Sequence, residues 1–228
     1  MFSFVPYGCF SVAVLFCFIF LFPLFFADVM LLALSKLGLS KEISIIAIFA
    51  IFIGSLINIP VKRIPRKEIL EALPLGMFGF SRIFPRFVQR RSYTIIALNV
   101  GGCIIPVLIA TYEFIRISSD GLWALIAMIL AVMINISVCY GLARPVQGVG
   151  IVLHAFIPGL VAAVCALIFY PQFAPMIAFN AGVLGPLLGA DLLNLRKISQ
   201  ISTGLASIGG AGTFDGIVIS GLVATLLV

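Results

Sequence analysis

The stretch that decides the fold is "GADLLNLRKISQISTGLASIGGAGTFDGI", residues 189–217. It joins two apolar runs, and each run carries one aspartate, Asp191 before the junction and Asp215 after it. An unpaired carboxylate inside a membrane is energetically costly, and ionisable residues in membrane segments usually serve function. The stretch therefore predicts a connection between two membrane spans that brings two acidic groups toward one site.

The composition of the whole chain is that of a membrane protein. Of the 228 residues, 63% are hydrophobic and 10% are charged, whereas a soluble domain contains about 25% charged residues. Apolar runs of about 20 residues mark membrane helices. Such runs fall at 8–34, 42–60, 93–115, 121–142, 150–170, 175–195 and 205–228. We expect an all-α fold, a polytopic transmembrane helical bundle of seven or eight spans forming a single domain over residues 1–228.

Residues 61–92 form a basic loop that holds eight of the 14 Lys and Arg residues. Because basic loops are retained on the cytoplasmic side, the N-terminus and this loop are predicted to be cytoplasmic in an integral protein of a prokaryotic cell membrane. Membrane topology and anionic lipids account for this charge, so nucleic acid is not an expected partner. Two segments of the loop look like short interfacial helices, "KEILEAL" (67–73) and "FSRIFPRFV" (80–88). Whether its carboxylates, Glu68 and Glu71, join a site stays open.

Unusual polar residues from separate parts of the chain converge in this topology. With seven spans, all of them fall in the inner half of the membrane, although they come from six different places in the sequence. They are Asn58, Asn99, Arg144, His154, Asp191, Asn194 and Asp215. Their shared depth predicts one cavity that opens toward the cytoplasm.

The glycines of "GGAG", residues 209–212, are expected to break the last span. Each Gly costs about 1 kcal/mol in a helix relative to Ala, and irregular backbone at membrane depth is tolerated only where protein or water satisfies it. Thr213 is then the expected N-cap of a half-helix that runs to the C-terminus, with Asp215 in its first turn. Three other glycines share one helical face and predict close helix packing: Gly182, Gly185 and Gly189.

Five motifs carry a resemblance to a known family: "GSLINIP", "NVGG", "ARPVQGVG", "GADLLNL" and "SIGGAGTFDGI". In this order they resemble a prokaryotic family of multi-pass membrane proteins that was long catalogued as a domain of unknown function. The family looks similar to transmembrane glycosidases and, more distantly, to presenilin-type intramembrane aspartyl proteases. The protease motifs, Tyr-Asp and Gly-x-Gly-Asp, are not reproduced, because Asp191 follows Gly-Ala and Asp215 follows Gly-Thr-Phe.

The first functional hypothesis is a membrane-embedded hydrolase that uses paired carboxylates, in its preferred form a glycosidase. Asp191 is the expected acid and Asp215 the expected base or nucleophile. Five side chains are expected to bind the substrate: Asn58, Asn99, Arg144, Asn194 and Thr213. The expected partners are membrane lipids and a glycolipid or lipid-linked sugar. No cofactor or metal is expected, since the chain has one His and no Cys/His cluster.

Two alternatives use the same residues. An intramembrane aspartyl protease would have Asp191 and Asp215 share a proton and activate water. An ion- or proton-coupled transporter would place them in a broken helix, as such transporters do. The transporter predicts a second broken span in the first half of the chain, where Gly101-Gly102 echo Gly209-Gly210. The sugar, the linkage, a retaining or inverting outcome and the oligomeric state stay open.

Overall fold

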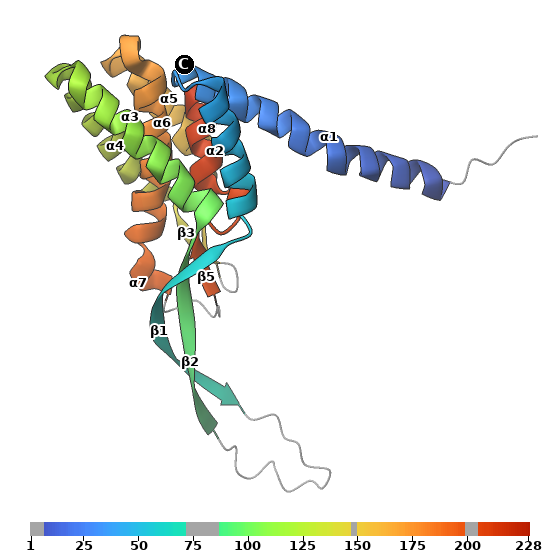
Figure 1. Ribbon diagram of the computed structural model, residues 1–228. Coiled ribbons are helices and arrows are strands. Elements are labelled where there is room, and N and C mark those ends of the chain that lie inside the picture. The colour runs from blue at the N-terminus through green and yellow to red at the C-terminus, as the bar shows by residue number, and fades with distance from the viewer. Residues whose placement is uncertain (1–6, 72–86, 147–149, 199–204) are drawn as a thin grey trace, which may run out of the picture.

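The computed structural model describes residues 7–71, 87–146, 150–198 and 205–228. Helices form a bundle, and a long hairpin extends from one end of it (Figure 1). The helices are α1 (Tyr7–Lys36), α2 (Lys41–Gly54), η2 (Val100–Ile104), α3 (Ile105–Asp120), α4 (Leu122–Leu142), α5 (Phe156–Phe169), η3 (Pro171–Phe173), α6 (Ala174–Leu184), η4 (Gly185–Leu192), α7 (Leu195–Ile198), η5 (Gly212–Phe214) and α8 (Gly216–Leu226). The strands are β1 (Asn58–Glu71), β2 (Phe87–Asn99), β3 (Arg144–Val146), β4 (Gly150–Val152) and β5 (Leu205–Ile208).

Four helical segments of the described chain are long and apolar enough to cross a membrane: Val14–Lys36, Val100–Asp120, Leu122–Leu142 and Pro171–Leu192. Helices α5 and α8 are apolar but shorter. The chain is therefore an integral membrane protein, while the predicted count of seven or eight spans is not confirmed. The shortfall has a local cause, because the predicted spans 150–170 and 205–228 begin in strands β4 and β5, which leaves only the shorter helices α5 and α8.

Two small sheets correct the prediction of an all-α fold. Strands β1 and β2 pair antiparallel, and β5 joins β2 in parallel between Ile95 and Leu98. The helix expected at 67–73 is wrong for its described part, which lies in β1, and residues 72–86 are outside the described residues. Pro60 and Pro65 cannot donate to a ladder, and β1 tolerates them because it is an edge strand.

Helix α6 lies at the centre of the bundle, packed against α3, α4, α5 and α8. The predicted packing role of the glycines in this part of the chain is confirmed. A Cβ added at Gly182 would lie 2.8 Å from the carbonyl oxygen of Ser220 in α8. One added at Gly189 would lie 2.3 Å from the carbonyl oxygen of Ile136 in α4. Small residues thus bring the helix backbones into contact, as is typical of membrane bundles.

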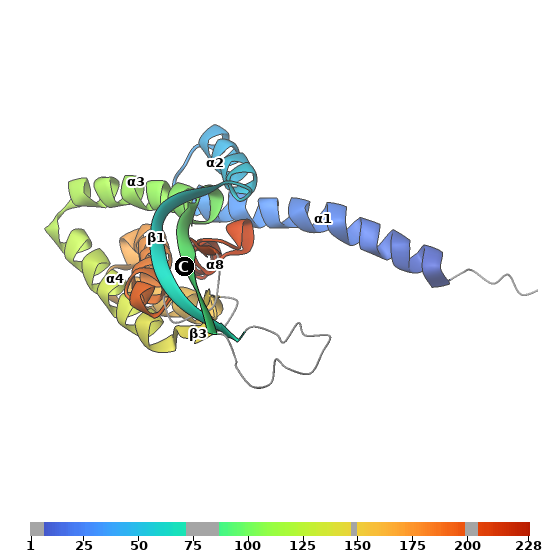
Figure 2. The same cartoon turned by 90° about the horizontal axis from the view of Figure 1, so that it is seen from below.

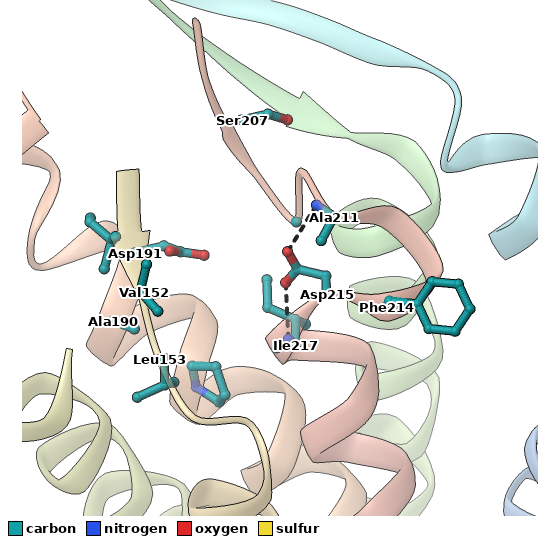
Figure 3. Close-up of a pocket in the computed structure, with 13 residues that line it drawn as sticks. Val152, Leu153, Ala190, Asp191, Ser207, Ala211, Phe214, Asp215 and Ile217 are labelled. Atoms are coloured by element: carbon teal, nitrogen blue, oxygen red, sulfur yellow. Dashed lines mark hydrogen bonds between the residues drawn. The ribbon is translucent and has the colours of Figure 1, made fainter. Parts of the chain in front are cut away.

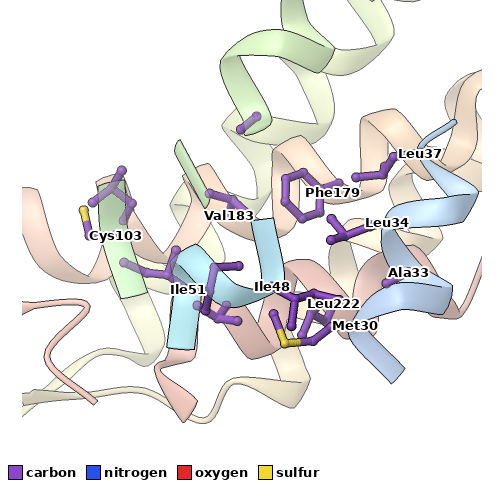
Figure 4. Close-up of a cluster of buried hydrophobic side chains, with 14 of the residues drawn as sticks. Met30, Ala33, Leu34, Leu37, Ile48, Ile51, Cys103, Phe179, Val183 and Leu222 are labelled. Carbon is purple, nitrogen blue, oxygen red and sulfur yellow. The ribbon is translucent and has the colours of Figure 1, made fainter. Parts of the chain in front are cut away.

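The C-terminal half of α1 is the only part of that helix, among its described residues, that belongs to the buried core. Met30, Leu34 and Leu37 pack with Ile51 of α2 and Phe179 of α6 in one apolar cluster (Figure 4). Figures 1 and 2 both show the N-terminal part of α1 extending away from the bundle. That part presents large apolar side chains outward, which suits contact with lipid.

Arg116 ties α3 to the end of α1. Within α3 it forms an ion pair at 3.0 Å with Glu113, whose side chain is fully buried, while the Arg116 side chain is 32% exposed. Arg116 also donates to the Leu37 carbonyl oxygen at 2.6 Å. We expect Arg116→Ala to lower the free energy of unfolding by about 3 kcal/mol, because it leaves a buried carboxylate unpaired. Chemical denaturation in detergent measures this, and the double variant with Glu113→Leu should recover most of the loss.

Candidate functional site

A pocket of about 250 Å³ lies at the hairpin end of the bundle, where β4, β5, the end of η4 and the start of α8 meet. Both predicted aspartates line it. Figure 3 shows the carboxyl groups of Asp191 and Asp215 pointing into the space between them. The predicted convergence of acidic groups from the last two apolar segments is present.

Asp191 is positioned by the wide helical turn η4, of which it is the second-last residue. Single π-helical turns are rare and occur frequently at functional sites. Pro186, at the start of η4, cannot donate a backbone hydrogen bond, which favours such a departure from α-helix. The Asn194 amide donates to the carbonyl oxygens of Gly189 and Ala190 and closes the end of the turn. Within the described chain, the Asp191 carboxyl group accepts no hydrogen bond, so its oxygens are available to a ligand in the pocket.

Asp215 is held in place by the turn that breaks the last apolar segment. Gly209 and Gly212 have φ of 70° and 63°, which favour glycine, and they fold residues 209–214 into a compact turn. The Asp215 oxygens then accept hydrogen bonds from the backbone N–H groups of Ala211 at 3.2 Å and Ile217 at 3.0 Å. Asp215 is thus the N-cap of α8.

The predicted break at "GGAG" is confirmed, and the predicted cap is wrong. Thr213 is buried in the short helical turn η5 and does not begin α8. The second left-handed glycine, Gly212, prolongs the turn, so the extended backbone that a cap needs first occurs at Asp215, with ψ of 152°. Asp215, which was predicted to lie in the first turn of this helix, is therefore its N-cap.

The turn rests on backbone from the first half of the chain. A Cβ added at Gly102 in η2 would lie 2.1 Å from the Gly209 carbonyl oxygen. One added at Gly101 would lie 2.0 Å from the Ile51 carbonyl oxygen of α2, and one at Gly212 would lie 2.4 Å from the Ser55 Cβ. Gly102 and Gly209, one from each of the glycine pairs that echo one another in the sequence, are therefore in direct contact.

Helix α1 contacts the same turn from the other side. The Phe214 ring lies 5.7 Å from the ring of Phe22 and 5.1 Å from that of Phe26, measured between centroids. Phe214 also lines the pocket and directly precedes Asp215. Aromatic contacts at these separations are favourable, so α1 helps to fix the turn that orients Asp215.

A network of amides and hydroxyls joins the base of the hairpin to the pocket. The buried Asn99 side chain donates to the Ser55 carbonyl oxygen at 2.7 Å and to the Asn58 side-chain oxygen at 3.2 Å. Its own oxygen accepts from the Gly102 N–H at 2.7 Å. The Ser207 hydroxyl donates to the same Asn58 oxygen. Ser207 lines the pocket, so the network ends there.

The structure places the predicted binding residues outside the pocket lining. Asn58 and Asn99 lie behind Ser207, Asn194 closes η4, Thr213 is buried in η5, and Arg144 is exposed on β3. Their contacts with a substrate stay predictions. Ser207 was missed, because the run "LASI" that contains it shows no alternation of polar and apolar residues, and only the structure places it in strand β5. In the described chain no group of three His, Cys, Asp or Glu residues gathers for a metal ion.

Apolar helices long enough to cross a membrane, with a carboxylate pair facing a pocket at one end, define an integral membrane protein with a built polar site. The chain belongs to the family described as "Protein of unknown function (DUF1614)", whose model matches residues 52–227. No curated protein and no solved structure matches the chain. The match includes every residue that lines the pocket and leaves out α1.

Proposed function

We propose that the protein is a membrane-embedded hydrolase in which Asp191 and Asp215 act as paired carboxylates on the glycosidic bond of a glycolipid or lipid-linked sugar. One observation carries the proposal: two carboxyl groups from separate helical segments face each other across one pocket. Glycoside hydrolysis uses such a pair of carboxyl groups, one on each side of the scissile bond.

The hydrogen bonds assign the two roles. Two backbone N–H groups donate to Asp215, and such donors stabilise a carboxylate in its ionised form. Asp215 is therefore the base or nucleophile. Among the described side chains, none donates a hydrogen bond to Asp191 and no cation pairs with it, so Asp191 is the proton donor. These are the roles expected from the sequence.

The reaction then runs as follows. Asp191 gives its proton to the glycosidic oxygen while the bond between that oxygen and the anomeric carbon breaks, and the lipid alcohol leaves. Asp215 either attacks the anomeric carbon, forming an intermediate that water hydrolyses, or takes a proton from a water molecule that attacks directly. A carboxyl separation of about 5 Å suits the first course and about 6.5–9.5 Å the second. In both courses water supplies the atoms of the new hydroxyl group.

Apolar side chains at the pocket suit a substrate with a lipid tail. Val152 and Phe214 line the pocket and keep about two-fifths of their surface exposed, at 37% and 46%. A lipid chain can cover these side chains while its polar head enters the pocket, which gains hydrophobic free energy for the complex.

A strand edge at the pocket favours a peptidase as the second candidate. Among the described strands, β4 pairs only with β3. It lines the pocket through Ile151 and Val152. An extended peptide can add its backbone hydrogen bonds to such an edge, which would lay a peptide bond beside the two aspartates.

A substrate panel decides between these functions. Purified protein in lipid is given lipid-tailed chromogenic glycosides and a labelled transmembrane peptide, alongside the Asp191→Asn variant. Asp28→Asn is the matched control, because Asp28 is an exposed carboxylate of α1 that does not line this pocket. We expect the wild type and the control to cleave a glycoside and Asp191→Asn to leave it intact. Cleavage of the peptide alone would favour the peptidase, and solute flux without cleavage would favour the transporter.

A further inference from the structure

The polar side chains of the pocket restrict what it can bind. Of the 13 lining residues, only Asp191, Ser207 and Asp215 have polar side chains. The aspartates have roles in the proposed reaction, and Ser207 has none. A serine hydroxyl has one proton to donate and two lone pairs that accept. What Ser207 offers to a ligand therefore depends on where its proton points.

Backbone groups fix the orientation of Asn99 first. The Ser55 carbonyl oxygen can only accept a hydrogen bond, so the Asn99 group 2.7 Å from it must be the NH₂. The Gly102 N–H can only donate, so the group 2.7 Å from it must be the Asn99 oxygen. Neither contact survives if the amide is turned over. The amide of Asn99 is thus oriented without ambiguity.

The orientation of Asn99 fixes Asn58 and then Ser207. The NH₂ of Asn99 lies 3.2 Å from the side-chain oxygen of Asn58, and the opposite amide orientation would set two NH₂ groups against each other. Asn58 therefore presents its oxygen, and the same oxygen contacts the Ser207 hydroxyl. That oxygen only accepts. The Ser207 proton consequently points to Asn58, away from the pocket.

We propose that Ser207 is a substrate-binding residue that acts solely as a hydrogen-bond acceptor, so that the pocket selects a hydroxyl-rich ring over an anionic head group. The Ser207 lone pairs accept from a ligand hydroxyl, and the free lone pairs of the Asp215 carboxylate do the same. At Ser207 and Asp215 a phosphate or carboxylate would meet acceptors of its own kind, and the negative charge of Asp215 would disfavour it. The inference rests on the proposed function for the identity of the ring, and it names a contact that the proposed function does not.

Binding without turnover tests the acceptor role. The probes are an alkyl thioglycoside, which resists hydrolysis, its singly deoxygenated analogues and an alkyl phosphate of the same chain length. Titration calorimetry compares wild type, Ser207→Ala, Ser207→Thr and the control Ser137→Ala, an exposed serine of α4. The wild type should bind one deoxy analogue about tenfold more weakly than the parent glycoside, as one lost hydrogen bond predicts. Ser207→Ala should bind the parent glycoside about tenfold more weakly than the wild type does, and it should bind that deoxy analogue as tightly as the wild type does. Ser207→Thr and the control should keep wild-type affinity for the parent glycoside.

Three results would overturn the inference: equal weakening of all glycosides by Ser207→Ala, no effect of that substitution, or alkyl phosphate binding as tight as that of the glycoside. A protein that binds no thioglycoside would overturn it as well. The proposed function fails separately, because selective binding through Ser207 with no cleavage of any glycoside would remove the hydrolase and leave the acceptor role. Circular dichroism of each variant shows that a lost affinity does not reflect unfolding.

Discussion

Asp191→Asn and Asp215→Asn are each expected to lower the turnover of a cleaved substrate by about 10²–10⁴-fold, the usual contribution of a positioned acid or base. Asparagine has almost the same shape as aspartate, so the pocket is kept while proton transfer is lost. The Asp215 change has a second consequence. The Ala211 and Ile217 N–H groups that held a carboxylate then face a neutral amide, which accepts less strongly.

The double variant distinguishes a shared mechanism from two separate effects. Because residues that act as one unit give non-additive losses, the combined substitution should be little slower than the slower single variant. Initial rates on the substrate found in the panel measure this, with Asp28→Asn as the control. Multiplication of the two single losses in the double variant would show that the aspartates act independently and would contradict the pair.

Gly102→Ala is expected to abolish turnover and to destabilise the fold by about 3 kcal/mol, the upper end of the range for overpacking. The new methyl carbon would lie 2.1 Å from the Gly209 carbonyl oxygen, and both partners are backbone that no rotamer change can move aside. The turn that carries Asp215 must then shift. Asn99 would also lose the hydrogen bond from the Gly102 N–H. The hydrogen bonds that link Asn99 through Asn58 to Ser207 would then be disturbed as well.

Gly141→Ala is the matched control, since a Cβ there would meet nothing within 4 Å. Thermal unfolding in detergent and initial rates are measured on both variants. Gly141→Ala should leave the rate unchanged and should not lower the stability, because alanine is the better helix former. A Gly102→Ala variant with wild-type rate and stability would mean that η2 and the turn at 209–212 do not touch, and the described base of the pocket would be wrong.

The sequence was sufficient to predict the parts of the site that depend on local chemistry. Hydropathy located the four helices that are long enough to cross a membrane, although the predicted count of seven or eight spans is not confirmed. The cost of consecutive glycines in a helix located the break at 209–212. The isolation of Asp191 and Asp215 among apolar residues marked them as partners. Each of these inferences needs only a window of neighbouring residues, and the structure agrees with each.

The features that were not predicted depend on contacts between distant segments. Strand β5 forms because β2, about 110 residues earlier in the chain, supplies its partner backbone. Ser207 becomes a site residue only through that pairing, and the proton of its hydroxyl is assigned only through Asn58. Likewise, the cap moved from Thr213 to Asp215 because two left-handed glycines, Gly209 and Gly212, lengthen the turn, and a φ angle is not visible in composition.

The shared pocket of the two aspartates is tested most directly by cross-linking. In a variant whose five native cysteines are replaced, Asp191→Cys and Asp215→Cys are combined and treated with dibromobimane, which fluoresces when it joins two nearby thiols. The pair Asp28→Cys with Asp215→Cys is the control. We predict strong fluorescence from the 191/215 pair and none from the control. No fluorescence from the 191/215 pair, when a monofunctional reagent labels each single cysteine, would contradict the existence of the site.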